Sequence, residues 1–264
     1  GSRQATDKPM TSTSEQYVEY SPVTELPGQL ASRTQLDMMR ARYAWAASYC
    51  HDKAVVEAAC GPGVALPNLA RISDRLEAGD VDPLNLEYAR AVTDGIPNVR
   101  VRRFDALSMP LDRGSQDVAI LFEALYYLED VPRFLRESKR ILKAGGVLLL
   151  SMPNPDWPGF HPSPLSTRYW KASELPSELT RQGFRSTMYW GFPETASALR
   201  RLAVAAGMVP RTMAARAMVK TVFSGYTAPI PAQLNLLDAD APAFETSPAE
   251  TSRYRLLYVE AIRQ

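Results

Sequence analysis

The stretch that decides the fold lies between Ala54 and Gly63 and reads AVVEAACGPG. The run from Ala54 to Ala59 is apolar except for one acid, Glu57, as expected for a strand buried inside a parallel sheet. A glycine turn ends this run, and a helical stretch follows at once. The acid, the turn and the N-terminus of a helix therefore lie together, where a ligand can approach the backbone closely.

The same pattern, short apolar runs separated by amphipathic stretches, continues from Ala54 to Met152. It predicts an α/β fold in which helices cover both faces of a parallel sheet. The expected strands are Ala54–Ala59, Arg75–Asp80, Val99–Phe104, Asp117–Phe122, Gly146–Met152, Ser186–Phe192 and Tyr254–Ile262. The expected helices include Leu30–Tyr49 ahead of the sheet, Val131–Leu142 and Ser173–Gln182.

Two segments depart from this pattern. Residues 1–28 begin with Gly1-Ser2, typical of a cloning scar, and continue as a polar stretch without periodicity, so we expect a flexible N-terminal segment. Residues 193–251 interrupt what would otherwise be a short hairpin between the last two strands. We therefore expect an insertion that acts either as a cap or as an oligomer contact, for example in a homodimer. Residues 29–192 and 252–264 then form the main domain.

Composition narrows the class of partner. The 264 residues carry a formal net charge of +1, so no global field attracts nucleic acid or an anionic membrane, although a local basic patch is compatible with this balance. The apolar runs are far shorter than the roughly 18 residues that a transmembrane helix needs. Two cysteines and two histidines form no zinc motif, which predicts no metal site and a reducing cytoplasmic location.

The glycine turn disfavours a phosphate ligand. A dinucleotide site needs a third glycine three residues after Gly63, where this chain has Leu66. The carboxylate of Glu57 would repel a phosphate, and it suits a ligand with a cationic centre or an amine.

Acids also end the next two expected strands. Asp80 follows the glycine turn by roughly the twenty residues at which an acid can accept both hydroxyls of a ribose. Asp82 is the alternative ribose ligand, but Pro83 after it favours a helix N-cap role. After the third strand, the Asp105 carboxylate and the Ala106 backbone N–H can receive an adenine ring. Together these acids predict a site for adenosine without phosphates.

The chain resembles class I S-adenosylmethionine-dependent methyltransferases of the small-molecule type. The resemblance rests on five motifs in the family's order: Val55–Gly63, Ala78–Arg90, Phe104–Pro110, Asp117–Leu128 and Leu142–Asn154. It implies a Rossmann-like sheet of seven strands with a reversed last hairpin, and S-adenosyl-L-methionine as cofactor. Ala59, where the family often has glycine, is the one departure.

The resemblance also implies roles for the site residues. The methionine part of the cofactor would be surrounded by Glu57, Ala59, Gly61 and Gly63. Asp80, followed by Val81, would hold the ribose, and Asp105 and Ala106 the adenine. Phe122 and Glu123 would lie near the methionine end.

The expected reaction is O-methylation of a hydroxyl on a small polar acceptor, such as a sugar or another natural product. Removal of the hydroxyl proton calls for a base, and His161 is the first candidate because it follows the fifth strand in a proline-rich loop. Asp156, Glu123 and Tyr126 are the other candidates. N-methylation of an amine is an alternative that needs no strong base. A non-catalytic cofactor-binding subunit is a further alternative.

Overall fold

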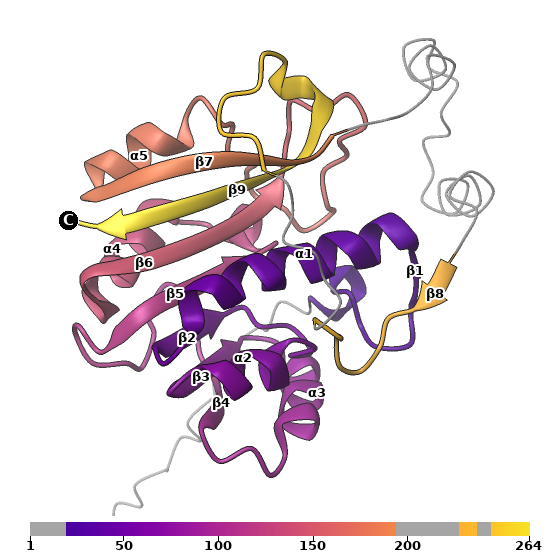
Figure 1. The fold of residues 1–264 in the computed structure, drawn as a ribbon, viewed down its shortest axis with the longest axis vertical. Coiled ribbons are helices and arrows are strands. Elements are labelled where there is room, and N and C mark those ends of the chain that lie inside the picture. The colour runs from indigo at the N-terminus through magenta and orange to yellow at the C-terminus, as the bar shows by residue number, and fades with distance from the viewer. Residues whose placement is uncertain (1–19, 194–226, 237–243) are drawn as a thin grey trace, which may run out of the picture.

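The structure is a computed structural model that describes residues 20–193, 227–236 and 244–264. Its centre is a sheet of seven strands in the order β4-β3-β2-β5-β6-β9-β7 (Figure 1). The last strand of the chain, β9, lies between β6 and β7 and runs antiparallel to both, which confirms the reversed last hairpin of a mostly parallel sheet. The strands are β2 (Ala54–Ala58), β3 (Arg75–Asp80), β4 (Val99–Arg103), β5 (Gln116–Phe122), β6 (Leu142–Pro153), β7 (Phe184–Pro193) and β9 (Tyr254–Arg263).

Helices cover both faces of the sheet, as the sequence predicts. One core contains residues of α1 (Arg33–Cys50), α2 (Leu66–Ile72) and α3 (Pro83–Thr93). The other contains residues of α4 (Val131–Ile141) and α5 (Leu175–Arg181). Short 3-10 turns complete the described elements: η1 (Ser21–Val23), η2 (Leu125–Tyr127) and η3 (Thr251–Arg253).

The strands supply both cores because successive side chains point to opposite faces. Val55 of β2 and Ile120 of β5 pack in the core under α1, whereas Val56 and Leu121 pack under α4. Apolar residues at successive positions of these strands therefore bury side chains in both layers at once. The carboxyl ends of the parallel strands meet at one edge, where ligands bind in sheets of this kind.

The helix ahead of the sheet begins later than the sequence predicts. Residues Leu30–Ser32 form a short strand, β1, which pairs with β8 (Thr227–Pro229) from the expected insertion. The helix then starts at Arg33, because Ser32 and Gln35 form a capping box that satisfies the first free backbone N–H groups.

Much of the expected insertion, residues 194–226 and 237–243, lies outside the described residues, as does 1–19. The described part after β8 packs on the main domain. Ile230 and Leu234 are buried in the core beside α1 and α2, and the Leu234 backbone N–H donates to the Val64 carbonyl at 2.8 Å. The role of 193–251 as a cap or an oligomer contact stays a prediction.

Candidate active site

A cavity of about 870 Å³ lies at the carboxyl edge of β2, β3, β4 and β5. Nine of the twelve predicted site residues line it: Ala59, Gly61, Asp80, Val81, Asp105, Ala106, Phe122, Glu123 and Tyr126. The other three, Glu57, Gly63 and His161, are not among its lining residues. The parallel topology explains the gathering, because it brings the end of each strand to the same edge.

The glycine turn after β2 shapes the wall of the cavity, because its backbone adopts left-handed conformations. Ala59, Gly61 and Gly63 have φ of 52°, 55° and 71°. At Ala59 this conformation is strained, because an L-residue with a side chain rarely adopts it. A Cβ on Gly63 would lie 2.7 Å from Leu66 Cδ1 and 2.9 Å from Ala89 Cβ. Gly63 therefore serves the close packing of α2 and α3 behind the cavity wall.

Glu57 lies beneath the turn, almost fully buried. Its Oε1 accepts a 2.8 Å hydrogen bond from the Tyr43 hydroxyl, and its Oε2 has no hydrogen-bond partner among the described residues. Burial raises the pKa of Glu57 to about 7, although the bond from Tyr43 and the charge of Arg42 lower it. This acid is held by α1 rather than exposed to the cavity.

The two acids after β3 have separate positions. Asp80 lines the cavity, and its carboxylate accepts the backbone N–H groups of Gly61 and Asp82, each at 2.9 Å. Burial raises its pKa, and these bonds oppose the shift. Asp82 is the N-cap of α3, where it accepts from the Leu84 N–H at 2.9 Å, and it is not a lining residue. Only Asp80 presents its carboxylate to a ligand in the cavity.

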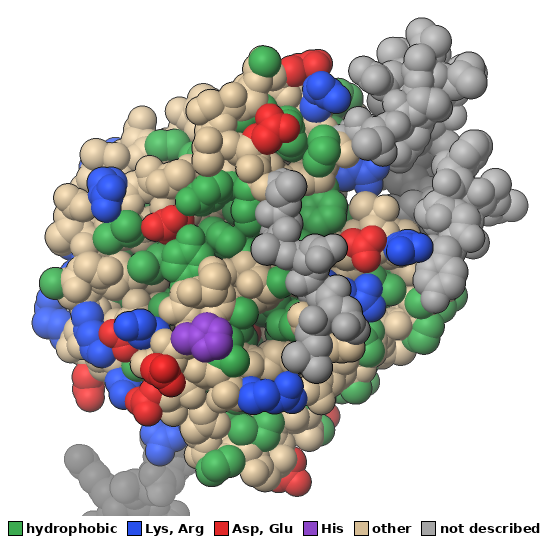
Figure 2. Space-filling view, viewed as in Figure 1, with side chains coloured by type: hydrophobic (Ala, Val, Ile, Leu, Met, Phe, Trp, Pro, Cys, Tyr) green, Lys and Arg blue, Asp and Glu red, His purple; other side chains and the backbone are tan. Residues whose placement is uncertain are grey.

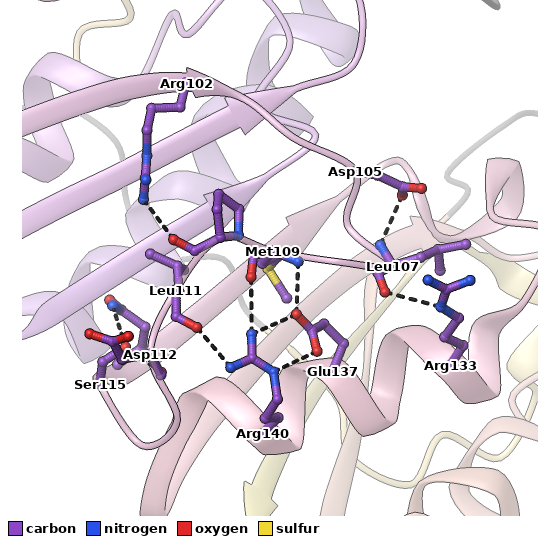
Figure 3. A network of polar contacts seen from close by, with 12 residues as sticks. Arg102, Asp105, Leu107, Met109, Leu111, Asp112, Ser115, Arg133, Glu137 and Arg140 are labelled. Atoms are coloured by element: carbon purple, nitrogen blue, oxygen red, sulfur yellow. Dashed lines mark hydrogen bonds and ion pairs between the residues drawn. The ribbon is translucent and has the colours of Figure 1, made fainter. Parts of the chain in front are cut away.

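The turn after β4 forms the next part of the wall. The carboxylate of Asp105 accepts the backbone N–H of Leu107 at 2.8 Å, as Figure 3 shows. Ala106 is buried between them. This local bond fixes the turn, so its backbone faces the cavity in a defined orientation.

Glu123, directly after β5, combines partial burial with backbone strain. Its φ is 52°, and its carboxylate accepts a 2.7 Å hydrogen bond from the Ser151 hydroxyl. Burial raises its pKa, while Arg42 and the Ser151 bond lower it. Tyr126 lies close by in the wall, with its ring stacked on that of Tyr169 at 4.5 Å.

His161 does not join these residues. It is exposed in the loop after β6, outside the lining of the cavity. The sequence places this loop at the correct edge of the sheet. The loop contacts the cavity wall through other side chains: the Tyr169 ring stacks on Tyr126, and the Ser163 hydroxyl accepts a 2.8 Å hydrogen bond from Tyr127. The structure therefore does not bring His161 together with the residues that line the cavity, and a role for it in the reaction stays a prediction.

Of the expected flexible N-terminal segment, residues 1–28, the structure describes only 20–28, and these contact the main domain. Residues 20–28 lie over the cavity, and four of them line it: Tyr20, Val23, Thr24 and Glu25. The backbone N–H of Tyr20 donates to Asp82 at 2.8 Å, and the Tyr20 ring lies 5.3 Å from that of Tyr127. These long-range contacts hold a segment that has no periodicity of its own.

Arg42 is a lining residue that the sequence reading missed. Its side chain is 9% exposed and donates to Glu25 at 2.7 Å, and its Nε has no hydrogen-bond partner among the described residues. A charged residue three positions after the buried Met39, on the packed side of α1, was the available signal. A buried guanidinium that faces a cavity is suited to a carboxylate ligand.

Two absences among the described residues bear on the class of site. No described group of three or more His, Cys, Asp and Glu side chains is placed to hold a metal ion. Among the described helices, none is long and apolar enough to cross a membrane. The face shown in Figure 2 carries acidic and basic side chains intermixed, rather than a broad basic surface.

Comparisons with known proteins agree with this geometry. Residues 56–150 match the methyltransferase domain family. A probable S-adenosylmethionine-dependent methyltransferase of Mycobacterium tuberculosis is 33% identical over 141 residues, 51% of this chain and 50% of the relative. A ubiquinone biosynthesis O-methyltransferase of Methylocella silvestris is 28% identical over 48% of this chain and 54% of its own length. The chain thus spans about half the length of these curated relatives.

The fold has the same likeness. The YcgJ protein of Bacillus subtilis superposes with a TM-score of 0.56 at 16% identity, over 88% of this chain and 98% of that one. Residues 56–150 therefore match a methyltransferase domain, and the chain is similar in sequence and in fold to S-adenosylmethionine-dependent methyltransferases, which indicates S-adenosylmethionine as the cofactor.

Proposed function

We propose that this protein transfers a methyl group from S-adenosylmethionine to a hydroxyl of a small polar acceptor, such as a sugar or another natural product. The observation that carries the proposal is Glu123. It is a partly buried carboxylate of raised pKa in the wall of the cavity, directly after β5. A base in that position can accept the proton that a hydroxyl loses on methylation.

The cavity has groups for each part of the cofactor. The Asp80 carboxylate suits the ribose hydroxyls, and the turn at Asp105 and Ala106 suits the adenine. Arg42, with its unsatisfied Nε, suits the carboxylate of the methionine part. These groups lie on different walls of the cavity, so the cofactor would be held at both ends and its methyl group directed toward Glu123.

The acceptor side of the cavity is aromatic and polar. Tyr20, Tyr126 and Tyr127 line it together with Glu25 and Glu123. Its volume, about 870 Å³, is within the range of small-molecule sites, so a compact acceptor fits better than a polymer. Tyrosine rings can stack on a sugar or an aromatic ring while their hydroxyls bind polar groups.

Two effects would then accelerate the reaction. Bound S-adenosylmethionine supplies an electrophilic methyl group. The aromatic wall would orient the acceptor oxygen behind that methyl group, and this alignment accounts for most of the rate. Glu123 would take the hydroxyl proton as the new oxygen–carbon bond forms. The positive charge of Arg42 and the hydrogen bond from the Ser151 hydroxyl lower the Glu123 pKa and so oppose the effect of burial.

The identity of the base is tested by two substitutions. Glu123→Gln should lower kcat by roughly 10²–10⁴ and leave the affinity for S-adenosylhomocysteine within about twofold of wild type. His161→Ala, in the exposed loop, should leave both unchanged. The activity of the wild type should fall as the pH falls through the Glu123 pKa, because a protonated carboxyl cannot accept a proton, and this acidic limb should be lost in Glu123→Gln.

A panel of hydroxyl and amine acceptors completes the test. Methylation of hydroxyls alone supports the proposal. Methylation of amines by both wild type and Glu123→Gln would indicate N-methylation, which needs no strong base. Cofactor binding without transfer to any acceptor would indicate a non-catalytic subunit.

The free, buried thiols of Cys50 and Cys60 are in keeping with the cytoplasmic location that we propose.

A further inference from the structure

A second concave surface lies between α4, the chain that follows β4, and the end of β9. This groove has a volume of about 490 Å³. Six basic residues line it: Arg113, Arg133, Arg136, Lys139, Arg140 and Arg263. Glu137 is the one acid in its lining. Since the whole chain has 30 basic and 29 acidic residues, this groove concentrates one sign of charge in an otherwise balanced protein.

Glu137 does not neutralise the groove as a whole, because both oxygens of its carboxylate already accept hydrogen bonds. Arg140 donates to both of its oxygens at 2.7 Å, and the backbone N–H of Met109 donates at 2.7 Å (Figure 3). The hydrogen bonds from Arg140 hold the pKa of Glu137 below its ordinary value. The pair accounts for one basic residue and leaves five others.

Two of the arginines fix the wall of the groove to α4. Arg140 donates to the carbonyls of Leu111 at 2.7 Å and Met109 at 3.0 Å, and Arg133 Nε donates to the Leu107 carbonyl at 3.2 Å. The segment from Leu107 to Leu111 is therefore attached to the helix along its length. A ligand would meet a formed surface rather than one that it must order, which lowers the cost of binding.

Three basic side chains remain available. Within the described part of the chain, no hydrogen bond or ion pair of the Arg113, Arg136 or Lys139 side chains is found. Like charges gathered in one concavity repel one another and produce a local positive potential. A bound anion would relieve that repulsion, and guanidinium groups bind phosphate oxygens in a bidentate manner.

We propose that this groove binds a soluble small molecule that carries two or more phosphate groups. Several cations around one small concavity match several anionic oxygens in a compact ligand. A duplex nucleic acid would require a broad basic face instead. The proposal does not depend on the methyl-transfer function. The groove and the cofactor cavity are separate sites that have only Leu107 in common among their lining residues.

Calorimetry with tripolyphosphate tests the proposal on the full chain at low salt. Wild type should bind one equivalent. The variant Arg113→Ala/Arg136→Ala/Lys139→Ala should bind at least roughly tenfold more weakly, through the loss of three charge-assisted contacts. The control Lys53→Ala/Arg71→Ala/Arg90→Ala removes the same charge from exposed positions elsewhere and should bind within about twofold of wild type.

Four results would overturn the proposal. These are no binding by wild type, an equal loss in both triple variants, displacement of tripolyphosphate by S-adenosylhomocysteine, and binding only to phosphatidylglycerol vesicles. The first removes the site, and the second shows that total charge alone is responsible. The third places the anion in the cofactor cavity, and the fourth favours a membrane surface. Equal thermal stability of the variants and wild type confirms that folding is intact.

Discussion

The hydroxyl of Tyr43 on α1 donates a 2.8 Å hydrogen bond to Glu57 in the centre of the sheet. Burial raises the pKa of this acid to about 7 from an ordinary value of 4.5. The folded protein therefore holds a proton that the unfolded chain releases between these two pH values. As a result, this group makes the free energy of unfolding fall as pH rises from 4.5 to 7, by at most about 3 kcal/mol.

The substitution Glu57→Gln should remove this dependence, because the amide keeps an acceptor for Tyr43 but does not ionise. Measured by denaturant titration without cofactor, the variant should gain stability relative to wild type as pH rises from 5 to 8. Stability curves that stay parallel over that range would show that Glu57 ionises normally in the folded protein.

A second prediction separates the two acids after β3. Asp80→Asn should weaken S-adenosylhomocysteine binding by about 1–3 kcal/mol, because a charged acceptor in a nearly buried position is lost. Asp82→Ala should leave that affinity nearly unchanged and lower the free energy of unfolding by about 1 kcal/mol, because it removes the N-cap of α3. Calorimetry and denaturant titration measure the two effects. The reverse pattern would make Asp82 the ribose ligand.

A third prediction concerns Gly63. Backbone strain alone should lower the free energy of unfolding by about 1–2 kcal/mol in Gly63→Ala. The total loss should exceed about 2 kcal/mol, because the new methyl group also meets Leu66 and Ala89. Gly95→Ala is the matched control. Gly95 has a similar φ of 75° with nothing within 4 Å of the added carbon, so it reports the strain alone. Equal losses in the two variants would show that α2 and α3 move apart without cost.

A fourth prediction concerns the segment after β8. Leu234 is 1% exposed, and its carbonyl accepts a 2.7 Å hydrogen bond from the Asn68 side chain. Leu234→Ala should cost about 2–5 kcal/mol of stability, as for other large-to-small changes in a core. Leu165→Ala, at a position that is 37% exposed, should cost well under 1 kcal/mol. A small loss at Leu234 would mean that this segment is not part of the domain core.

The sequence by itself determined the sheet and the cofactor edge. The run from Arg75 to Asp80 was predicted to the residue, and β2 and β5 to within one residue, because each strand is a local apolar pattern with a sharp end. Asp80 ends β3, Glu123 follows β5 directly, and Asp105 lies two residues after β4. Once parallel order is given, their positions at one edge need no further information.

Only the tertiary structure decided what covers that edge. Tyr20 joins the cavity wall through its contacts with Asp82 and Tyr127, which are more than 60 residues away in sequence. Arg42 joins it through its ion pair with Glu25, 17 residues away. β1 likewise forms by pairing with β8, far along the chain. His161 lies outside the cavity although its loop is at the correct edge. Local periodicity records which face of an element is buried, but it does not record which distant segment packs there, because that choice depends on the shapes of surfaces that exist only after folding.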